Sequence, residues 1–170
     1  MLVRSAIIFK WCLYALAGLA CALVQGAFLQ RITLWGVLPF LYPLIAAIPA
    51  TLEESAAGTV YALCTGIFCD LLLPSPIPCF YTLIFPLVGL AAGLLSQSLI
   101  PAGYLCSAAA ALPAYLLTGV FHCIVLWATG HAAWSAGMSV ALRELCVSLL
   151  WSLPMTWLFR KVFFRVHIDD

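Results

Sequence analysis

Long apolar stretches alternate with short polar or turn-forming ones along all 170 residues of the chain. A helix needs about 20 apolar residues, each rising about 1.5 Å, to cross a hydrocarbon core about 30 Å thick. Six stretches approach that length. They predict membrane-spanning helices over about residues 11–29, 34–52, 55–73, 79–97, 104–128 and 140–159.

The connections between these stretches are too short to hold a soluble domain. Residues 1–170 are therefore predicted to form a single transmembrane domain, an all-α six-helix bundle. The second stretch is the exception to the regular pattern, because it contains Pro39, Pro43 and Pro49. Proline removes a backbone donor and disfavours the helix interior, so five spans with a broken or re-entrant second segment is the alternative.

Composition supports a membrane protein, since 66% of the residues are hydrophobic, only 8% are charged, and mean hydropathy is +1.16. Soluble domains carry about 25% charged residues. Arg4 and Lys10 precede an apolar run, as in a signal peptide. That run, residues 11–29, is longer than the roughly 7–15 residues of a signal's apolar region, so we interpret it as a retained first helix.

The distribution of Lys and Arg predicts the orientation, because these residues are enriched on the cytoplasmic side. With six spans, two groups lie on opposite sides: Arg4, Lys10, Arg160, Lys161 and Arg165 on one, Arg31 and Arg143 on the other. Both termini are therefore expected in the cytoplasm. The net charge of +1 and the lack of a basic stripe argue against a nucleic-acid partner.

The stretch GTVYALCTGIFCDLLL, Gly58 to Leu73, contains the acid Asp70 inside an apolar helix. Gly58, Ala62, Gly66 and Asp70 follow one another at steps of four residues, which places them on one helix face. Small residues allow close helix contact in lipid, so this face is expected to meet another helix. Three roles of the acid stay open: a cap at the junction with the next helix, a partner contact, and coupling to a ligand or proton.

Two other helices carry similar small residues. Gly18, Ala22 and Gly26 are spaced by four in the first helix, and Gly89 and Gly93 form a G-x-x-x-G pair in the fourth. We expect the stripe of the first helix to face outward toward a partner. The remaining stripes predict a tightly packed bundle.

Residue types that support catalysis or metal binding are scattered. The eight cysteines contain no C-x-x-C pair and are interpreted as small apolar side chains, and no serine stands in G-x-S-x-G. His122, Cys123 and His131 match no zinc pattern. Two charged pairs, Glu53-Glu54 and Arg143-Glu144, are interpreted as interfacial charges. The sequence predicts no enzyme, metal or cofactor.

The transport alternative is a substrate-binding subunit of a vitamin importer. Such a subunit needs polar side chains that converge on a pocket. The predicted outer half offers a sparse set: Asp70, Tyr81, Thr82 and His122. A protein-facing role is therefore preferred over a solute site.

The segment LPFLYPLIAAIPATLEESAAGTVYALCTGIFCDLLLPSPIPCFYTLIFPLVGLAAGLL, Leu38 to Leu95, resembles the bacterial rod shape-determining protein MreD family. The resemblance rests on a proline-bearing second helix and on the Gly66–Asp70 element. The last helix and basic tail, Ser152 to Arg165, are similar too. The turn PSPIPCFYTL differs, because it lacks the glycine that many members carry.

The resemblance implies a non-catalytic subunit of the cell-wall elongation machinery in the bacterial inner membrane. It implies a single-span MreC-like partner and, indirectly, an MreB-like filament and peptidoglycan synthases. It also implies a fold similar to the substrate-binding subunits of energy-coupling-factor importers, which is the basis of the transport alternative.

Overall fold

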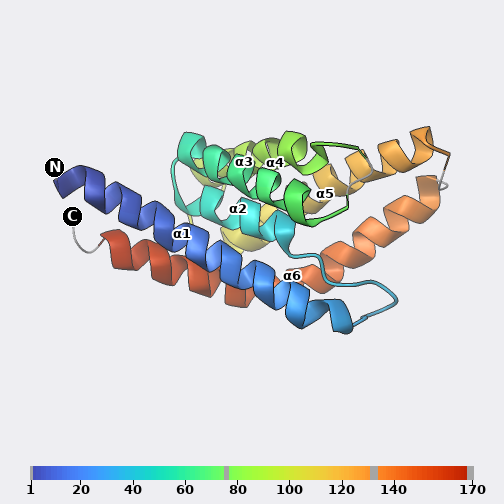
Figure 1. Cartoon of the computed structure of the whole chain (residues 1–170), viewed down its shortest axis with the longest axis horizontal. Helices are drawn as coiled ribbons and strands as arrows, with labels where there is room; N and C mark the ends of the chain where they lie inside the picture. The colour runs from blue at the N-terminus through green and yellow to red at the C-terminus, as the bar shows by residue number, and fades with distance from the viewer. Residues whose placement is uncertain (1, 75–76, 131–133, 168–170) are drawn as a thin grey trace.

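The computed structural model describes residues 2–74, 77–130 and 134–167, and it is almost entirely helical. The chain runs back and forth along one axis, so that the start of α1 and the end of α6 lie at the same end of the bundle (Figure 1). The elements are α1 Leu2–Ala27, η1 Leu29–Arg31, α2 Tyr42–Leu52, α3 Ser55–Leu72, α4 Phe80–Ser98, α5 Tyr104–Ala128 and α6 Trp134–His167.

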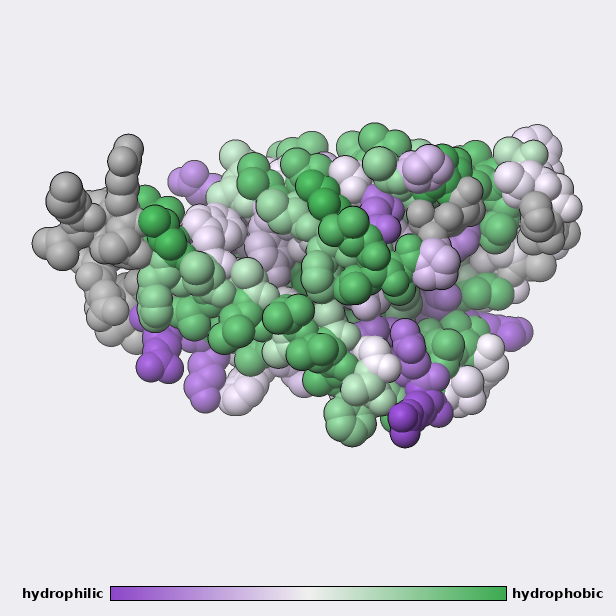
Figure 2. Space-filling view, viewed as in Figure 1, coloured by the Kyte–Doolittle hydropathy of each residue, from purple (hydrophilic) through white to green (hydrophobic). Residues whose placement is uncertain are grey.

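Five of these helices have the length and composition of membrane spans: residues 7–31, 55–72, 80–98, 104–128 and 137–165. Most of the predicted helix positions agree with the structure, and α1 and α6 are longer than expected. The surface fits this interpretation, because large apolar side chains are exposed along α1, α4 and α6. Figure 2 shows that apolar residues cover much of the visible face.

The second predicted helix, 34–52, is wrong over its first half. Helix α2 begins only at Tyr42. The preceding segment makes an isolated bridge between Leu34 and Val37 around a tight turn with positive φ at Trp35 and Gly36. Pro39 is the physical reason, because a residue before proline avoids helical geometry. The alternative of a broken second segment is therefore the one that the structure adopts.

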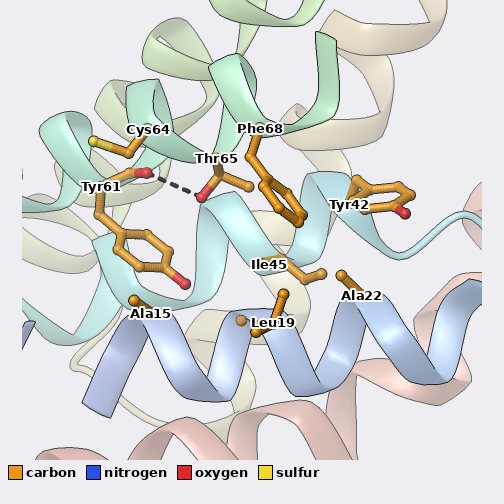
Figure 3. Close-up of a pocket in the computed structure, with 10 residues that line it drawn as sticks. Ala15, Leu19, Ala22, Tyr42, Ile45, Tyr61, Cys64, Thr65 and Phe68 are labelled. Carbon is orange, nitrogen blue, oxygen red and sulfur yellow. Dashed lines mark hydrogen bonds between the residues drawn. The ribbon is translucent and has the colours of Figure 1, made fainter. Parts of the chain in front are cut away.

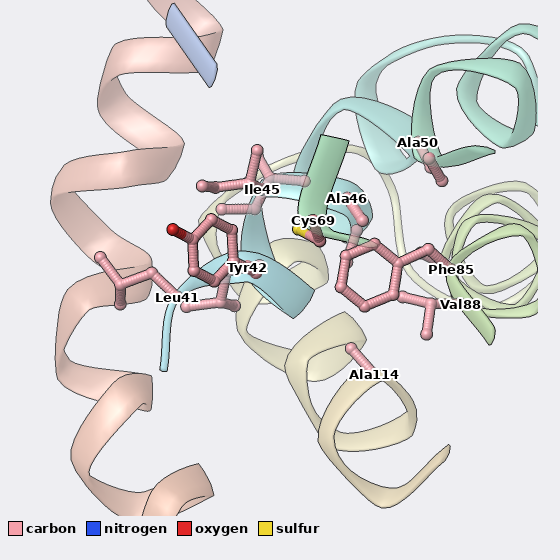
Figure 4. Packing of buried hydrophobic residues seen from close by; sticks show 14 of the residues in the cluster. Leu41, Tyr42, Ile45, Ala46, Ala50, Cys69, Phe85, Val88 and Ala114 are labelled. Atoms are coloured by element: carbon pink, nitrogen blue, oxygen red, sulfur yellow. The ribbon is translucent and has the colours of Figure 1, made fainter. Parts of the chain in front are cut away.

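Helix α2 lies at the centre of the bundle. Residues 41–51 are all buried, since α2 is packed against α1, α3, α4, α5 and α6. Figure 4 shows its side chains Tyr42, Ile45 and Ala46 near Cys69 of α3 and Phe85 of α4. A helix that is apolar all round suits this position. The core of the protein is thus built around its shortest α-helix.

Candidate functional site

The break before α2 brings non-helical backbone into the interior of the bundle. Three side chains from three other helices bond to it. From α1, Gln25 donates to the carbonyl of Pro39 at 2.6 Å and accepts from the amide of Leu41 at 3.1 Å. The hydroxyl of Ser148 in α6 accepts from the amide of Phe40 at 3.1 Å.

The third side chain is Tyr115 of α5, whose hydroxyl donates to the carbonyl of Phe40. Within a membrane, irregular backbone is tolerated only where protein or water satisfies its polar groups. Gln25, Tyr115 and Ser148 supply these bonds, and all three are buried. The segment is therefore fixed in place by α1, α5 and α6 together.

Asp70 at the end of α3 caps the start of α4. One carboxylate oxygen accepts the amide of Tyr81 at 3.0 Å. The other accepts the amide of Thr82 at 2.8 Å and its hydroxyl at 2.6 Å. Amides in the first turn of a helix have no partner within the helix and favour a negative charge. Of the three roles left open for Asp70, this geometry is that of the cap.

The small residues of α3 and α4 pack against each other and against α2. A side-chain carbon at Gly58 would lie 2.4 Å from Cα of Ala50 in α2, and one at Gly66 would lie 2.6 Å from the carbonyl oxygen of Tyr81. A carbon at Gly89 would lie 2.8 Å from Cβ of Ala62. Backbones this close leave no room for a second protein at the α3 stripe.

The remaining glycine of the α4 pair, Gly93, packs in the same way, since an added carbon would lie 2.9 Å from the hydroxyl of Ser55. Together the α3 stripe and the α4 pair join the two helices into one closely packed hairpin.

The stripe of α1 divides into two parts. Gly18 and Ala22 are buried, and a carbon at Gly18 would lie 2.4 Å from the hydroxyl of Tyr61 in α3. Gly26 is exposed, with nothing within 4 Å of an added carbon. The expectation that the whole stripe faces outward is corrected, because α1 leans on the bundle through Gly18 and Ala22.

Glu53 is more than an interfacial charge, which corrects that interpretation. Its carboxylate forms an ion pair with Lys10 of α1 and accepts a hydrogen bond from the hydroxyl of Tyr14 at 2.9 Å. Tyr14 is fully buried and stacks on Phe159 of α6. This cluster ties the end of α2 to α1 and α6. Its neighbour Glu54 is exposed, as expected.

A groove of about 320 Å³ runs between α1 and α3 with α2 at its base. Figure 3 shows Ala15, Leu19 and Ala22 of α1 facing Tyr61 and Phe68 of α3. The described backbones of these two helices stay apart, while α1 packs mainly on α6. The lining is almost entirely apolar, as a surface that contacts lipid or another membrane helix must be.

A second cavity, of about 280 Å³, lies among α4, α5, α6 and the segment before α2. Its lining includes the aromatic side chains of Phe40, Tyr81 and Tyr115, the imidazole of His122 and the carboxylate of Glu144. Helices α5 and α6 are in close contact beside this cavity. An added carbon at Gly119 would lie 2.6 Å from Cβ of Ala141, and one at Gly137 would lie 2.6 Å from the sulfur of Cys123.

This cavity corrects the interpretation of Glu144 as an interfacial charge. The cavity is lined by more polar side chains than the sequence indicated. Asp70 and Thr82 are not part of this lining, because they bond to each other in the cap. His122 lies edge-on to the ring of Phe80, with centroids 5.6 Å apart. No group of three potential metal ligands exists among the residues that the structure describes; His131 lies outside them.

The residues that sequence reasoning missed are Glu144, Tyr115 and Ser148. The available signal was their position, because a polar residue inside a predicted span faces protein or a cavity more often than lipid. Comparison with known proteins adds no identification: no family model, curated protein or solved structure matches the chain.

Proposed function

We propose that the chain is a non-catalytic scaffold subunit of the cell-wall elongation machinery, similar to the MreD family, in the bacterial inner membrane. Both termini face the cytoplasm, and the fold is of the type found in substrate-binding subunits of energy-coupling-factor importers. The subunit binds the transmembrane helix of an MreC-like partner. Through that partner it acts on an MreB-like filament and on peptidoglycan synthases.

The groove between α1 and α3 is the observation that carries this proposal. Its α1 wall consists of the exposed residues Ala15 and Leu19 and of the small residues Gly18 and Ala22, which are buried. Small residues on a groove wall let an incoming helix approach its backbone closely, which is the main source of affinity between helices in lipid. The exposed Cys64 on the α3 wall marks the opposite side of the groove.

The distribution of charge supports the proposed orientation. Arg160 and Lys161 lie in the last third of α6, at the end of the bundle where α1 begins. The guanidinium of Arg160 lies 4.9 Å from the ring centroid of Tyr104 at the start of α5. Arg31 lies at the opposite end of α1. Cations concentrated at the end that holds both termini are what the positive-inside rule expects of a cytoplasmic face.

Filling the groove tests the proposal. Ala15 and Ala20 are both exposed on α1, but only Ala15 lines the groove. We expect Ala15→Phe to reduce recovery of the co-expressed MreC-like protein with the tagged chain, and Ala20→Phe to leave it unchanged. Equal recovery with both variants, at equal amounts of folded protein, would exclude this groove as the binding surface.

Cysteine crosslinking provides a direct test of position. Cys64 is an exposed groove residue, whereas Cys12 and Cys146 are exposed elsewhere. With all other cysteines replaced, a cysteine series along the partner's transmembrane helix is expected to crosslink to Cys64 with helical periodicity. A chain that retains only Cys146 serves as the control. Crosslinking to Cys146 in place of Cys64 would move the interface to α6.

The importer alternative is favoured by one observation, the cavity beside Glu144 with its tyrosine and histidine side chains. A vitamin-binding subunit would retain a solute through purification or gain thermal stability on adding one. Retention through purification is not expected of a scaffold, so analysis of the purified chain for a bound vitamin separates the two functions.

A further inference from the structure

Among the residues that the structure describes, three carboxylates are partly buried at helix ends or inside helices, and the chain supplies partners to two of them. Asp70 accepts three hydrogen bonds from Tyr81 and Thr82. Glu53 pairs with Lys10 and accepts a hydrogen bond from Tyr14. Glu144 makes no hydrogen bond or ion pair within the described ranges 2–74, 77–130 and 134–167.

The carboxylate of Glu144 is accessible from the cavity that it lines. No fully buried side-chain nitrogen or oxygen lacks a hydrogen-bond partner in the part of the chain that the structure covers. Because Glu144 has no such partner, its oxygens are not sealed inside the protein. Glu144 is partly buried, at the wall between α5 and α6 and at the level of Tyr81 in the first turn of α4.

The surroundings of Glu144 are mainly apolar and aromatic. The rings of Phe40 and Tyr81 lie with centroids 6.1 Å apart, and both line the cavity. Tyr115 also lines it, but its hydroxyl is used by the carbonyl of Phe40. A carboxylate beside aromatic faces attracts a cation twice, through the negative charge and through the ring quadrupoles.

We propose that this cavity binds a small organic cation, whose ammonium group pairs with Glu144 while its apolar part lies against Phe40 and Tyr81. An ionised Glu144 repels an anion. A wholly apolar ligand leaves the carboxylate unpaired in a low-dielectric site, which is costly. The volume of about 280 Å³ suits a molecule with one ring and a short amine chain.

This binding site is independent of the scaffold role. It uses α4, α5, α6 and the segment before α2, whereas the proposed partner groove is lined by α1, α2 and α3. Loss of partner binding on filling the groove and loss of cation binding at Glu144 are therefore separate results.

The probe is phenethylamine, a cation at neutral pH, and 2-phenylethanol is its neutral counterpart. The full-length chain is purified in detergent, and thermal unfolding is followed over a concentration series of each compound. We expect phenethylamine to raise the unfolding temperature saturably, since a ligand that binds the folded state stabilises it. The alcohol is expected to give no saturable shift.

Two matched carboxylate variants locate the site. Glu144→Gln is expected to raise the apparent Kd for phenethylamine by at least about tenfold, because a charged hydrogen-bonded contact contributes that much. Glu54→Gln removes an exposed carboxylate at the start of α3, outside the cavity, and is expected to leave the Kd unchanged.

Three results would overturn the proposal: no saturable shift with phenethylamine in the wild-type chain, an equal shift with the alcohol, or an unchanged Kd in Glu144→Gln. If Glu144→Gln does not fold, the comparison of amine with alcohol in the wild-type chain still decides whether the site selects a cation. Phe40→Leu then replaces it as the site variant, with a weaker Kd expected.

Discussion

Asp70 and Glu144 lie near the same end of the bundle and share a neighbour, yet the fold treats them differently. The amide of Tyr81 donates to Asp70, while the ring of Tyr81 lines the cavity beside Glu144. Asp70 meets the free amides at the start of α4, so its charge is satisfied locally. Glu144 lies in the middle of a continuous helix, where every nearby amide is already bonded within the helix.

The backbone around a membrane carboxylate therefore determines whether the fold itself holds the carboxylate in place. A helix start provides donors, so a carboxylate there stabilises the fold. A helix interior provides none, so a carboxylate there depends on another side chain, water or a ligand. The following variants test this contrast. They compare side chains or glycines that the fold contacts with similar ones that it does not contact.

The largest effect is expected for Asp70→Ala. The change leaves the amides of Tyr81 and Thr82 without their acceptor, and we expect it to lower the free energy of unfolding by about 3 kcal/mol. Unfolding by denaturing detergent, followed by circular dichroism, measures the change. Asp70→Asn is expected to retain part of the stability, because its amide oxygen still accepts. A wild-type transition in Asp70→Ala would mean that the cap does not stabilise the fold.

The side-chain amide of Gln25 in α1 has hydrogen-bond partners for both its nitrogen and its oxygen. Its loss is expected to have the next largest effect. In Gln25→Leu, the carbonyl of Pro39 and the amide of Leu41 lose their partner, which we expect to cost about 2 kcal/mol. The matched control is Gln97→Leu, because Gln97 is exposed on α4. Hydrogen exchange at residues 38–41 provides a second measurement, with faster exchange expected only in Gln25→Leu.

Two glycines extend the contrast to packing. Gly58→Ala forces a carbon against Ala50 and is expected to lower the free energy of unfolding by about 1.5 kcal/mol. Gly26→Ala adds the same carbon in open space near the end of α1 and is expected to stabilise by up to about 0.5 kcal/mol through helix propensity. The two changes thus have opposite signs in one detergent titration. A matching sign would show that propensity, and not contact, governs both positions.

Much of the fold was predictable, because length and hydropathy alone define a membrane helix. The helices α3, α4 and α5 begin and end within a few residues of their predicted positions. The small residues of α3 were correctly placed on one face, since helical periodicity fixes it. Whether that face meets the same chain or a partner depends on tertiary packing, which periodicity does not contain.

The site was less predictable for two physical reasons. The bonds that fix the break before α2 join residues far apart in sequence, such as Phe40 with Ser148, so no local pattern reveals them. Glu144 was misinterpreted because Arg143 stands beside it. Adjacent helical residues point about 100° apart, so Arg143 faces outward while Glu144 lines the cavity.

The smallest effect is expected for Glu144→Gln, and it completes the contrast with Asp70. Because the carboxylate has no partner in the described chain, the neutral amide removes no native contact, and the free energy of unfolding is expected to change by less than about 0.5 kcal/mol. The same titration used for Asp70→Ala measures it. A loss comparable to that of Asp70→Ala would show that Glu144 is held by the fold after all. A gain in stability would instead mark a position where an unpaired charge is kept at a cost, as binding sites require.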